Sequence, residues 1–304
     1  MTDESLRSTH EIELESRRTA WQARKRHVAR KHTVGKLLLS LAVYTLAVSF
    51  FLPLAWLLSS SLKNDKQIFA LPPIWIPKPV MWSNYVEALT SARFDLFFRN
   101  TLLIASVTSV GVALSSALVA YGFSRIEWPG RDVLFFFVLS TMMVPYQVTM
   151  IPLYIVFSKL EWVGTYLPLI VPYFTGSSFY IFLLRQFFRM IPMELTDAAR
   201  IDGCSELGIM WRVILPLARP VVTVVVLFRV LDAWGDFFEP LIYISRLRQY
   251  TLSLGLLLFQ GMYFTEWHLL MAASAAITIP VVIVFFFTQR SFIEGVTFTG
   301  LHGV

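Results

Sequence analysis

Long apolar segments alternate with short polar ones along most of this chain. Six segments contain about 20 or more mostly apolar residues, which is the length a helix needs to cross the hydrocarbon core of a bilayer. They are Leu37–Leu58, Phe98–Phe123, Val133–Phe157, Tyr166–Phe188, Val221–Ile244 and Leu269–Thr288. A helix satisfies its own backbone hydrogen bonds in lipid. The pattern therefore predicts an all-α polytopic membrane protein with six transmembrane helices.

Prolines fall inside several of the predicted spans. Neighbouring helices or a cavity can satisfy the backbone groups that a proline frees, so such interruptions are tolerated in membranes. The residues concerned are Pro145, Pro152, Pro168, Pro172 and Pro280. We expect helix breaks at these positions.

The basic residues indicate how the chain is oriented. With residues 1–36 in the cytosol, sixteen Lys and Arg residues lie in the predicted cytosolic segments and seven in the outer segments. Because cytosolic loops are enriched in Lys and Arg, both termini are predicted to be cytosolic. The domain organisation that follows is a basic tail (1–36), a transmembrane domain (37–290) and a C-terminal tail (291–304), with the polar segment 189–220 inside the cell.

Composition agrees with a membrane protein. Hydrophobic residues make up 56% of the chain, charged residues 15%, and the mean hydropathy is +0.62. The net charge of +6 comes from basic residues beside the spans, so it does not indicate nucleic-acid binding. A single cysteine, Cys204, excludes an internal disulfide, and the scattered histidines predict no metal site.

The outer segment 59–97 is rich in proline and tryptophan. Its "SNYVEAL" stretch predicts a short helix with Ser83 as its capping residue. Two interpretations remain open for this segment, namely an ordered surface loop and a platform for a partner outside the cell.

The polar segment 189–220 predicts a helix, a sharp turn and a second helix. The first helix is expected from Met193 to Asp202, with Pro192 at its start, Gly203 in a left-handed conformation at its end, and a new helix near Ser205. Such a segment could be a solvated loop that closes the bundle, or a docking surface for another protein.

The spacing of small residues in this segment matches a known signature. Asp197-Ala198-Ala199 is followed by three residues, Gly203, nine residues and then Val213-Ile214-Leu215-Pro216. This resembles the E-A-A-x3-G-x9-I-x-L-P motif of binding-protein-dependent ABC importer permeases of the carbohydrate (maltose-type) family. Asp197 and Val213 depart from the motif but keep its charge or shape.

The resemblance implies a permease subunit that moves a sugar or related solute inward and is not an enzyme. In that family the loop is a coupling helix that docks on a separate ATPase, and here it would occupy residues 192–216. The coupling residues implied are Glu194, Asp197, Ala198, Ala199, Gly203, Leu215 and Pro216. The chain contains no G-x-x-x-x-G-K-[ST] phosphate loop, so ATP and Mg would bind to the partner and no cofactor to this chain.

The same resemblance implies the partners and the location. They are a second permease subunit, two ATPase subunits and an extracytoplasmic solute-binding protein, in the plasma (inner) membrane of a bacterium or archaeon.

Charged residues recur inside the fifth predicted span. Arg229, Asp232 and Asp236 lie three and four residues apart, so they would share one helix face, which Glu239 continues. Charges at such depth need partners or water. An Arg229–Asp232 ion pair is one interpretation. A lining of the substrate path is the other, and the residues considered for it are Asp236, Trp234 and Phe237, with Tyr146 and Tyr173 after two of the prolines.

Two other classes of function compete with an ATP-driven importer. An ion-coupled secondary transporter could use the carboxylates of the fifth span, although six unrepeated spans are few for such a protein. A membrane enzyme would need a clustered nucleophile, base or metal site, and none is evident in the sequence.

Overall fold

The computed structural model describes residues 36–261 and 263–300, so nearly all of the predicted N-terminal tail lies outside the described residues. The chain divides into two compact units at Ser59/Ser60, and each is described separately. Almost all of the helix Lys36–Ser60 lies in the first unit, and it matches the first predicted span within two residues at each end. Its apolar side chains are mostly exposed, as expected of a helix that meets lipid or another subunit.

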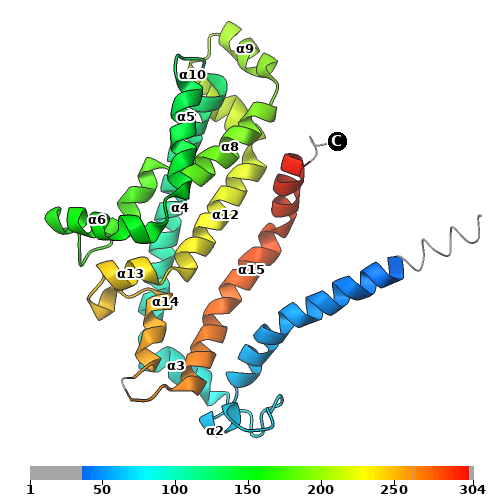
Figure 1. Cartoon of the computed structure of the whole chain (residues 1–304), viewed down its shortest axis with the longest axis vertical. Helices are drawn as coiled ribbons and strands as arrows, with labels where there is room; N and C mark the ends of the chain where they lie inside the picture. The colour runs from blue at the N-terminus through cyan, green and yellow to red at the C-terminus, as the bar shows by residue number, and fades with distance from the viewer. Residues whose placement is uncertain (1–35, 262, 301–304) are drawn as a thin grey trace, which may run out of the picture. The chain divides into compact units, whose positions relative to one another are not determined.

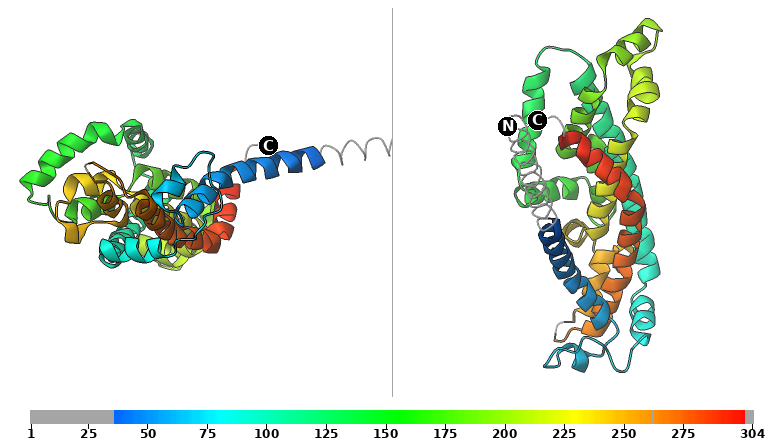
Figure 2. Two further views of the ribbon diagram at one scale, coloured as in Figure 1. Left: turned by 90° about the horizontal axis from the view of Figure 1, so that it is seen from below. Right: turned by 90° about the vertical axis from the view of Figure 1, so that its right-hand side faces the viewer.

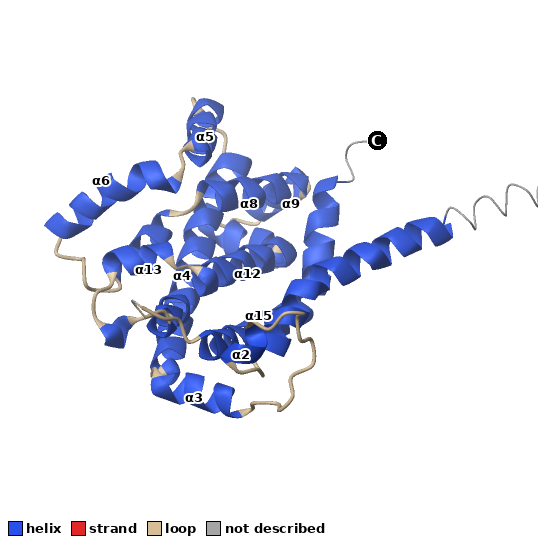
Figure 3. Cartoon of the chain, turned by 60° about the horizontal axis from the view of Figure 1, so that its bottom comes forward, coloured by secondary structure: helices blue, strands red, loops and turns tan. Residues whose placement is uncertain are grey.

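The second unit is a bundle of helices of very unequal length (Figures 1 and 3). The described residues contain no β-strand, only an isolated bridge between Gln260 and Thr265. This confirms the predicted all-α class. The helices are α2 (Asp65–Ile68), α3 (Ser83–Ser91), α4 (Phe94–Arg125), α5 (Arg131–Ser140), α6 (Tyr146–Lys159), α7 (Leu167–Ile170), α8 (Ser178–Met190), α9 (Met193–Ile201), α10 (Glu206–Ile209), α11 (Leu215–Leu217), α12 (Arg219–Gly235), α13 (Phe238–Tyr243), α14 (Leu252–Gly255) and α15 (Trp267–Gly300). Short 3-10 or π turns join several of them: η1 (Thr141–Met143), η2 (Val171–Thr175), η3 (Met210–Ile214), η4 (Leu247–Gln249) and η5 (Leu256–Phe259).

Helix α4 is the centre of the bundle, and α8 and α12 pack along it. The face it turns toward them carries small residues, among them Ala113, Ala117 and Ala120, all buried. Small side chains let helix backbones approach closely, which is how helices associate in lipid without a hydrophobic driving force. Ile209, Met210 and other residues after the α9–α10 turn join the same core cluster, so the polar segment is packed against the bundle.

Three of the six predicted spans are interrupted. The third bends by 97° between η1 and α6, where Val144 and Pro145 leave the helical conformation, so α6 projects sideways from the bundle (Figure 1). The fourth is broken between η2 and α8, at residues 176–177, and the fifth between α12 and α13, at residues 236–237. The run that leads into the fifth also bends by 83° at Ala218, between α11 and α12. Four helices of the described residues are long and apolar enough to cross a membrane, and the number rises to as many as six if each bent pair counts as one span.

Prolines break the helices at only some of the expected positions. Pro145 separates η1 from α6, and Pro168 and Pro172 occupy the first turns of α7 and η2. Pro152 and Pro280, however, lie inside α6 and α15 without ending them. Helix α15 also continues to Gly300, so the predicted C-terminal tail 291–304 begins within a helix (Figure 2).

The outer segment is ordered by side-chain contacts. Asn84 donates to the carbonyls of Ser61 and Lys63, and His268 at the start of α15 contacts Asp65 of α2 at 3.0 Å. The predicted capping role of Ser83 is wrong: Ser83 is the first residue of α3, Trp82 precedes it, and no side chain caps this helix end. The turn before α3 is instead fixed by Asn84.

Candidate functional site

Helix α9 presents one face outward and one face to its own chain. Glu194, Asp197 and Ala198 are exposed, as expected of docking residues. Thr196 and Ala199 are buried, and Ala199 belongs to the core cluster. Ala199 therefore packs α9 against the bundle, and the coupling role that the resemblance implies for it stays a prediction.

Gly203 ends α9 in the manner predicted. Its φ is +79°, and a Cβ at this position would meet nothing within 4 Å, so the requirement for glycine is purely conformational. The Gly203 amide donates to the Arg200 carbonyl, and the Cys204 amide donates to the Ala199 carbonyl, each with an N–O distance of 3.0 Å. This pair of bonds is the Schellman arrangement, which satisfies the last carbonyls of a helix.

Helix α10 begins immediately after the turn. The Ser205 hydroxyl accepts the Gly208 amide and caps it. Leu215 and Pro216 come ten or more residues later, in α11, where they line a groove with Ala113 and Ala117 of α4. The residues of the sequence motif thus do not share one surface, because the second half of the motif packs against α4.

Salt bridges and a hydrogen bond stabilise the α9–α10 turn. Arg200 contacts Asp197 at 3.0 Å and Glu206 at 2.7 Å. These carboxylates raise the pKa of the Arg200 guanidinium. Glu206 has the larger effect and Asp197 the smaller. The second oxygen of Glu206 accepts the Tyr121 hydroxyl of α4 at 2.6 Å. Asp197 is therefore exposed but held by Arg200 of its own chain, whereas Glu194 is exposed and has no salt bridge within the described residues.

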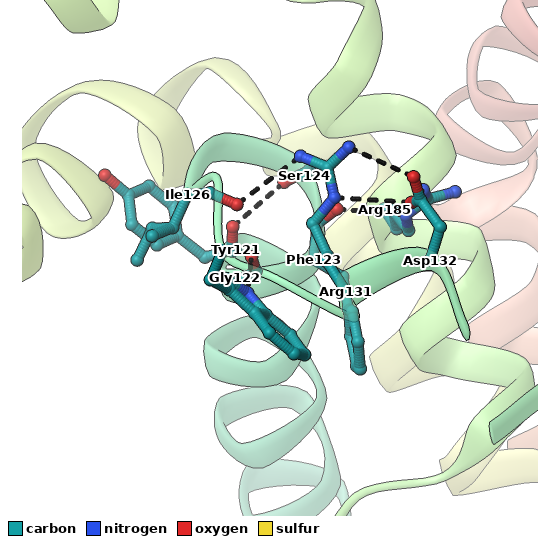
Figure 4. Close-up of polar contacts among 9 residues, drawn as sticks. Tyr121, Gly122, Phe123, Ser124, Ile126, Arg131, Asp132 and Arg185 are labelled. Carbon is teal, nitrogen blue, oxygen red and sulfur yellow. Dashed lines mark hydrogen bonds and ion pairs between the residues drawn. The ribbon is translucent and has the colours of Figure 1, made fainter. Parts of the chain in front are cut away.

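A second network surrounds the start of α5 (Figure 4). Arg185 of α8 donates to the Phe123 carbonyl at 3.1 Å and contacts Asp132 at 3.3 Å. Its guanidinium lies 3.9 Å from the centre of the Phe135 ring. Arg131 donates to the Ile126 carbonyl at 3.4 Å. These contacts join α4, α5 and α8 at the end of the bundle that carries the α9–α10 turn.

A polar hollow of about 530 Å³ lies between α8, α12 and α13. Its lining combines acidic groups with aromatic rings. Eleven residues line it: Tyr173, Ser177, Phe179, Tyr180, Arg229, Asp232, Gly235, Asp236, Phe237, Phe238 and Glu239. Asp236, Phe237 and Tyr173, three of the predicted substrate-path residues, are among them.

Arg229 and Asp232 do not form the predicted ion pair. Arg229 is buried, donates through Nε to the Thr108 hydroxyl at 3.0 Å, and lies 3.4 Å from the centre of the Tyr173 ring. Asp232 is exposed to the hollow and accepts the Tyr180 hydroxyl at 2.9 Å. Each charge finds a partner on another element, and within the described residues no salt bridge joins the two.

Asp236 and Glu239 do not continue the helix face that carries Arg229. Helix α12 ends at Gly235, and Asp236 has an extended backbone. The Asp236 carboxylate accepts the Glu239 amide at 3.2 Å, so it caps α13. Glu239 in turn accepts the Tyr173 hydroxyl at 3.2 Å. The break between α12 and α13 is what brings both carboxylates to the hollow.

Trp234 was expected in the substrate path, and the structure places it elsewhere. Its indole N–H donates to the Ile277 carbonyl of α15 at 3.0 Å, and its ring packs edge-on against Phe98 of α4. Tyr146, by contrast, lines a second hollow of about 540 Å³, which shares Tyr173 and Glu239 with the first.

Sequence reasoning missed Tyr180 and Ser177. Both follow Gly176, whose φ of +87° separates η2 from α8, and both line the hollow. A glycine between apolar segments, followed by hydroxyl-bearing residues, was the available signal. Exposed Ile201, at the end of α9, was also missed as part of the outward surface.

Comparison with known proteins agrees with these features. Residues 109–297, more than half of the chain, match the model of the family described as "Binding-protein-dependent transport system inner membrane component". The arabinooligosaccharides transport system permease protein AraQ of Bacillus subtilis (strain 168) is 32% identical, over 89% of this chain and 97% of that protein. The trehalose/maltose transport system permease protein MalG of Thermococcus litoralis is 30% identical, over 90% and 99%.

A solved structure shares the fold. It is the crystal structure of a bacterial ABC transporter involved in the import of the acidic polysaccharide alginate. One of its chains superimposes with a TM-score of 0.75 at 21% identity, covering 86% of this chain and 97% of that one. The chain therefore belongs to the family of binding-protein-dependent transport system inner membrane components, and it is a membrane transport subunit rather than an enzyme.

Proposed function

We propose that this chain is one of two permease subunits of an ATP-driven importer for a sugar or oligosaccharide. The geometry of the α9–α10 turn is the observation that carries the proposal. It presents a short outward helix whose exposed residues include Glu194, Ala198 and Ile201, held at a fixed angle by Gly203. Such a surface suits docking on a cytosolic ATPase, and residues 192–216 would transmit its movement.

The polar hollow supports a polyhydroxylated solute. Carboxylates and tyrosine hydroxyls can exchange hydrogen bonds with sugar hydroxyls, and the Tyr173, Tyr180 and Phe237 rings offer apolar surface to a sugar face. The relatives named for arabinooligosaccharides and for trehalose and maltose favour the same class. We propose Asp236, Glu239, Tyr173 and Tyr180 as groups that line the path.

The proposed assembly has two permease subunits, two ATPase subunits and an extracytoplasmic binding protein. ATP and Mg would bind only to the ATPases. The α9–α10 turn and both termini would lie in the cytosol of a bacterial or archaeal cell, and α2 and α3 would face the binding protein. The excess of basic residues in the segments on the side of the turn supports this orientation.

Co-reconstitution tests this function. The full chain, its partner permease and the ATPase are incorporated into vesicles, with binding protein and labelled oligosaccharide outside. ATP-dependent accumulation that needs both the ATPase and the binding protein is expected. Accumulation by the permease subunits alone, driven by an ion gradient, would favour a secondary transporter instead.

A further inference from the structure

Two buried arginines link the ends of α4 and α8 to each other. Arg125 of α4 donates to the main-chain carbonyls of Phe188 and Ile191, the latter at 2.6 Å, where α8 ends. Arg185 of α8 donates to the Phe123 carbonyl, where α4 ends. Both side chains are almost fully buried, with residue exposures of 2% and 6%.

The direction of the helices explains why arginine is needed twice. α4 and α8 end side by side at the same end of the bundle, so the partial negative charges of both C-termini lie together. Each guanidinium supplies a positive charge and several N–H donors to carbonyls in the last turn or cap of the other helix, where few main-chain partners remain. Separating α4 from α8 at this end would break the three bonds from the two arginines to these carbonyls.

Residues before and after the α9–α10 turn both contact the C-terminal end of α4. Before the turn, Arg125 also reaches the Pro192 carbonyl and the Thr196 hydroxyl, each at 3.5 Å. After the turn, Tyr121 donates to Glu206 at 2.6 Å. Arg200 closes the ring, because it contacts Glu206 and donates to the Arg125 carbonyl at 3.3 Å.

We propose that Tyr121, Arg125, Arg200 and Glu206 are positioning residues for energy coupling, because they make the turn and the end of α4 a single rigid body. This rests on the proposed function. Movement that an ATPase imposes on α9 then reaches α4 directly, and through it α8 and α12, which line the polar hollow. Without the polar contacts, only the packing of residues such as Ala199 would hold α9, and part of the imposed movement would be lost as pivoting at the segment Ile191–Pro192 and at Gly203.

Removal of single hydroxyl or charge groups tests the proposal with little risk to folding. Tyr121→Phe keeps the buried ring, and Glu206→Gln keeps the side-chain shape. Ser124→Ala is the matched control, because the Ser124 hydroxyl donates only to the Tyr121 carbonyl of its own helix. All variants are assembled with the partner permease, ATPases and binding protein in vesicles, and solute imported is divided by ATP hydrolysed.

Tyr121→Phe and Glu206→Gln are each expected to lower the ratio of solute imported to ATP hydrolysed by about fivefold, which is the size of effect expected from the loss of one hydrogen bond. The complex should stay assembled and still hydrolyse ATP. Ser124→Ala should match the wild type. Glu206→Gln also weakens the contact with Arg200, so it should lower the ratio at least as much as Tyr121→Phe, and the double variant should lose less than the sum of the two because both act on the contact between Tyr121 and Glu206. An unchanged ratio in both single variants overturns the rigid-body proposal alone, whereas a wild-type chain that does not couple to an ATPase overturns the proposed function as well.

A distance measurement gives an independent readout. Spin labels are placed at exposed Asp202 and Glu127 by Asp202→Cys and Glu127→Cys in a Cys204→Ser background. One narrow distance distribution, equal with and without nucleotide, is expected for the otherwise wild-type complex, and a broader one when Tyr121→Phe and Glu206→Gln are added. A distance that changes with nucleotide in the otherwise wild-type complex overturns the proposal.

Discussion

Arg125 and Arg185 each donate to main-chain carbonyls at the end of the helix that bears the other. The two arginines thereby fix α4 against α8 at the end of the bundle where the α9–α10 turn begins. An apolar helix pair in lipid has little hydrophobic force to hold it together, so buried polar contacts of this kind set the register of the pair.

Replacement of Arg185 tests this arrangement. Arg185→Met keeps most of the side-chain volume but removes the bond to the Phe123 carbonyl and the contact with the Phe135 ring. A buried carbonyl without a partner costs about 1–3 kcal/mol. We therefore expect a lower melting temperature of the detergent-solubilised chain, followed by tryptophan fluorescence. Arg189→Met, an exposed position one turn further along α8, is the control, and equal melting of the two variants would contradict the assignment.

Gly203 and Gly122 allow the effect of backbone conformation to be measured apart from the effect of steric crowding. A Cβ at Gly203 or at Gly122 meets nothing within 4 Å, but only Gly203 has a positive φ. Gly203→Ala should cost about 1–2 kcal/mol, because an L-residue is disfavoured in the left-handed region, whereas Gly122→Ala within α4 should be neutral or slightly stabilising. ATPase binding measured by titration should weaken only for Gly203→Ala. Equal binding by the two variants would show that the turn does not need this conformation.

Gly255 and Gly111 both lie against phenylalanine rings, with different room to adjust. A Cβ at Gly255 would lie 2.5 Å from Phe97, which is fully buried, while one at Gly111 would lie 2.7 Å from Phe174, which is half exposed. Overpacking against an immobile ring costs about 1–3 kcal/mol. Gly255→Ala should therefore lower the melting temperature clearly, and Gly111→Ala much less, because Phe174 can rotate away. A reversed order would mean that η2 is more rigid than its exposure indicates.

Asp236 can be tested as a cap and as a charge separately. Asp236→Asn keeps an oxygen for the Glu239 amide but removes the charge from the hollow, and Asp236→Ala removes both. We expect both variants to slow uptake, while only Asp236→Ala loses the roughly 1 kcal/mol of stability that a helix cap contributes. Melting curves and vesicle uptake measure the two effects. Normal uptake with Asp236→Asn would restrict this residue to its capping role.

The sequence predicted the features that depend on neighbouring residues alone, namely the length of apolar helices and the turn at Gly203. Hydrophobic length located the predicted spans within a few residues for the helix Lys36–Ser60 and for α4, and Gly203 with its flanking residues predicted the turn. The third predicted span, although mostly apolar, is bent by 97°. Hydropathy cannot distinguish one span from two helices at an angle, because both bury the same residues.

Side-chain partners were less predictable than helices. Arg229 and Asp232 lie at ion-pair spacing, yet Thr108, Tyr173 and Tyr180 on other elements provide their contacts. Trp234 was expected beside the solute and instead bonds to α15. These outcomes depend on which helices become neighbours, and spacing along a single helix does not contain that information.

The most direct test of the central claim is uptake of labelled oligosaccharide into vesicles that contain the complete importer, compared between wild type and Gly203→Pro. Proline cannot adopt the positive φ of Gly203, and it removes the amide that bonds to Arg200. We predict ATP-dependent uptake by the wild type and loss of both ATPase association and uptake in the variant. Uptake that proceeds without ATP, or that is unaffected by Gly203→Pro, would contradict a role for this turn in driving import.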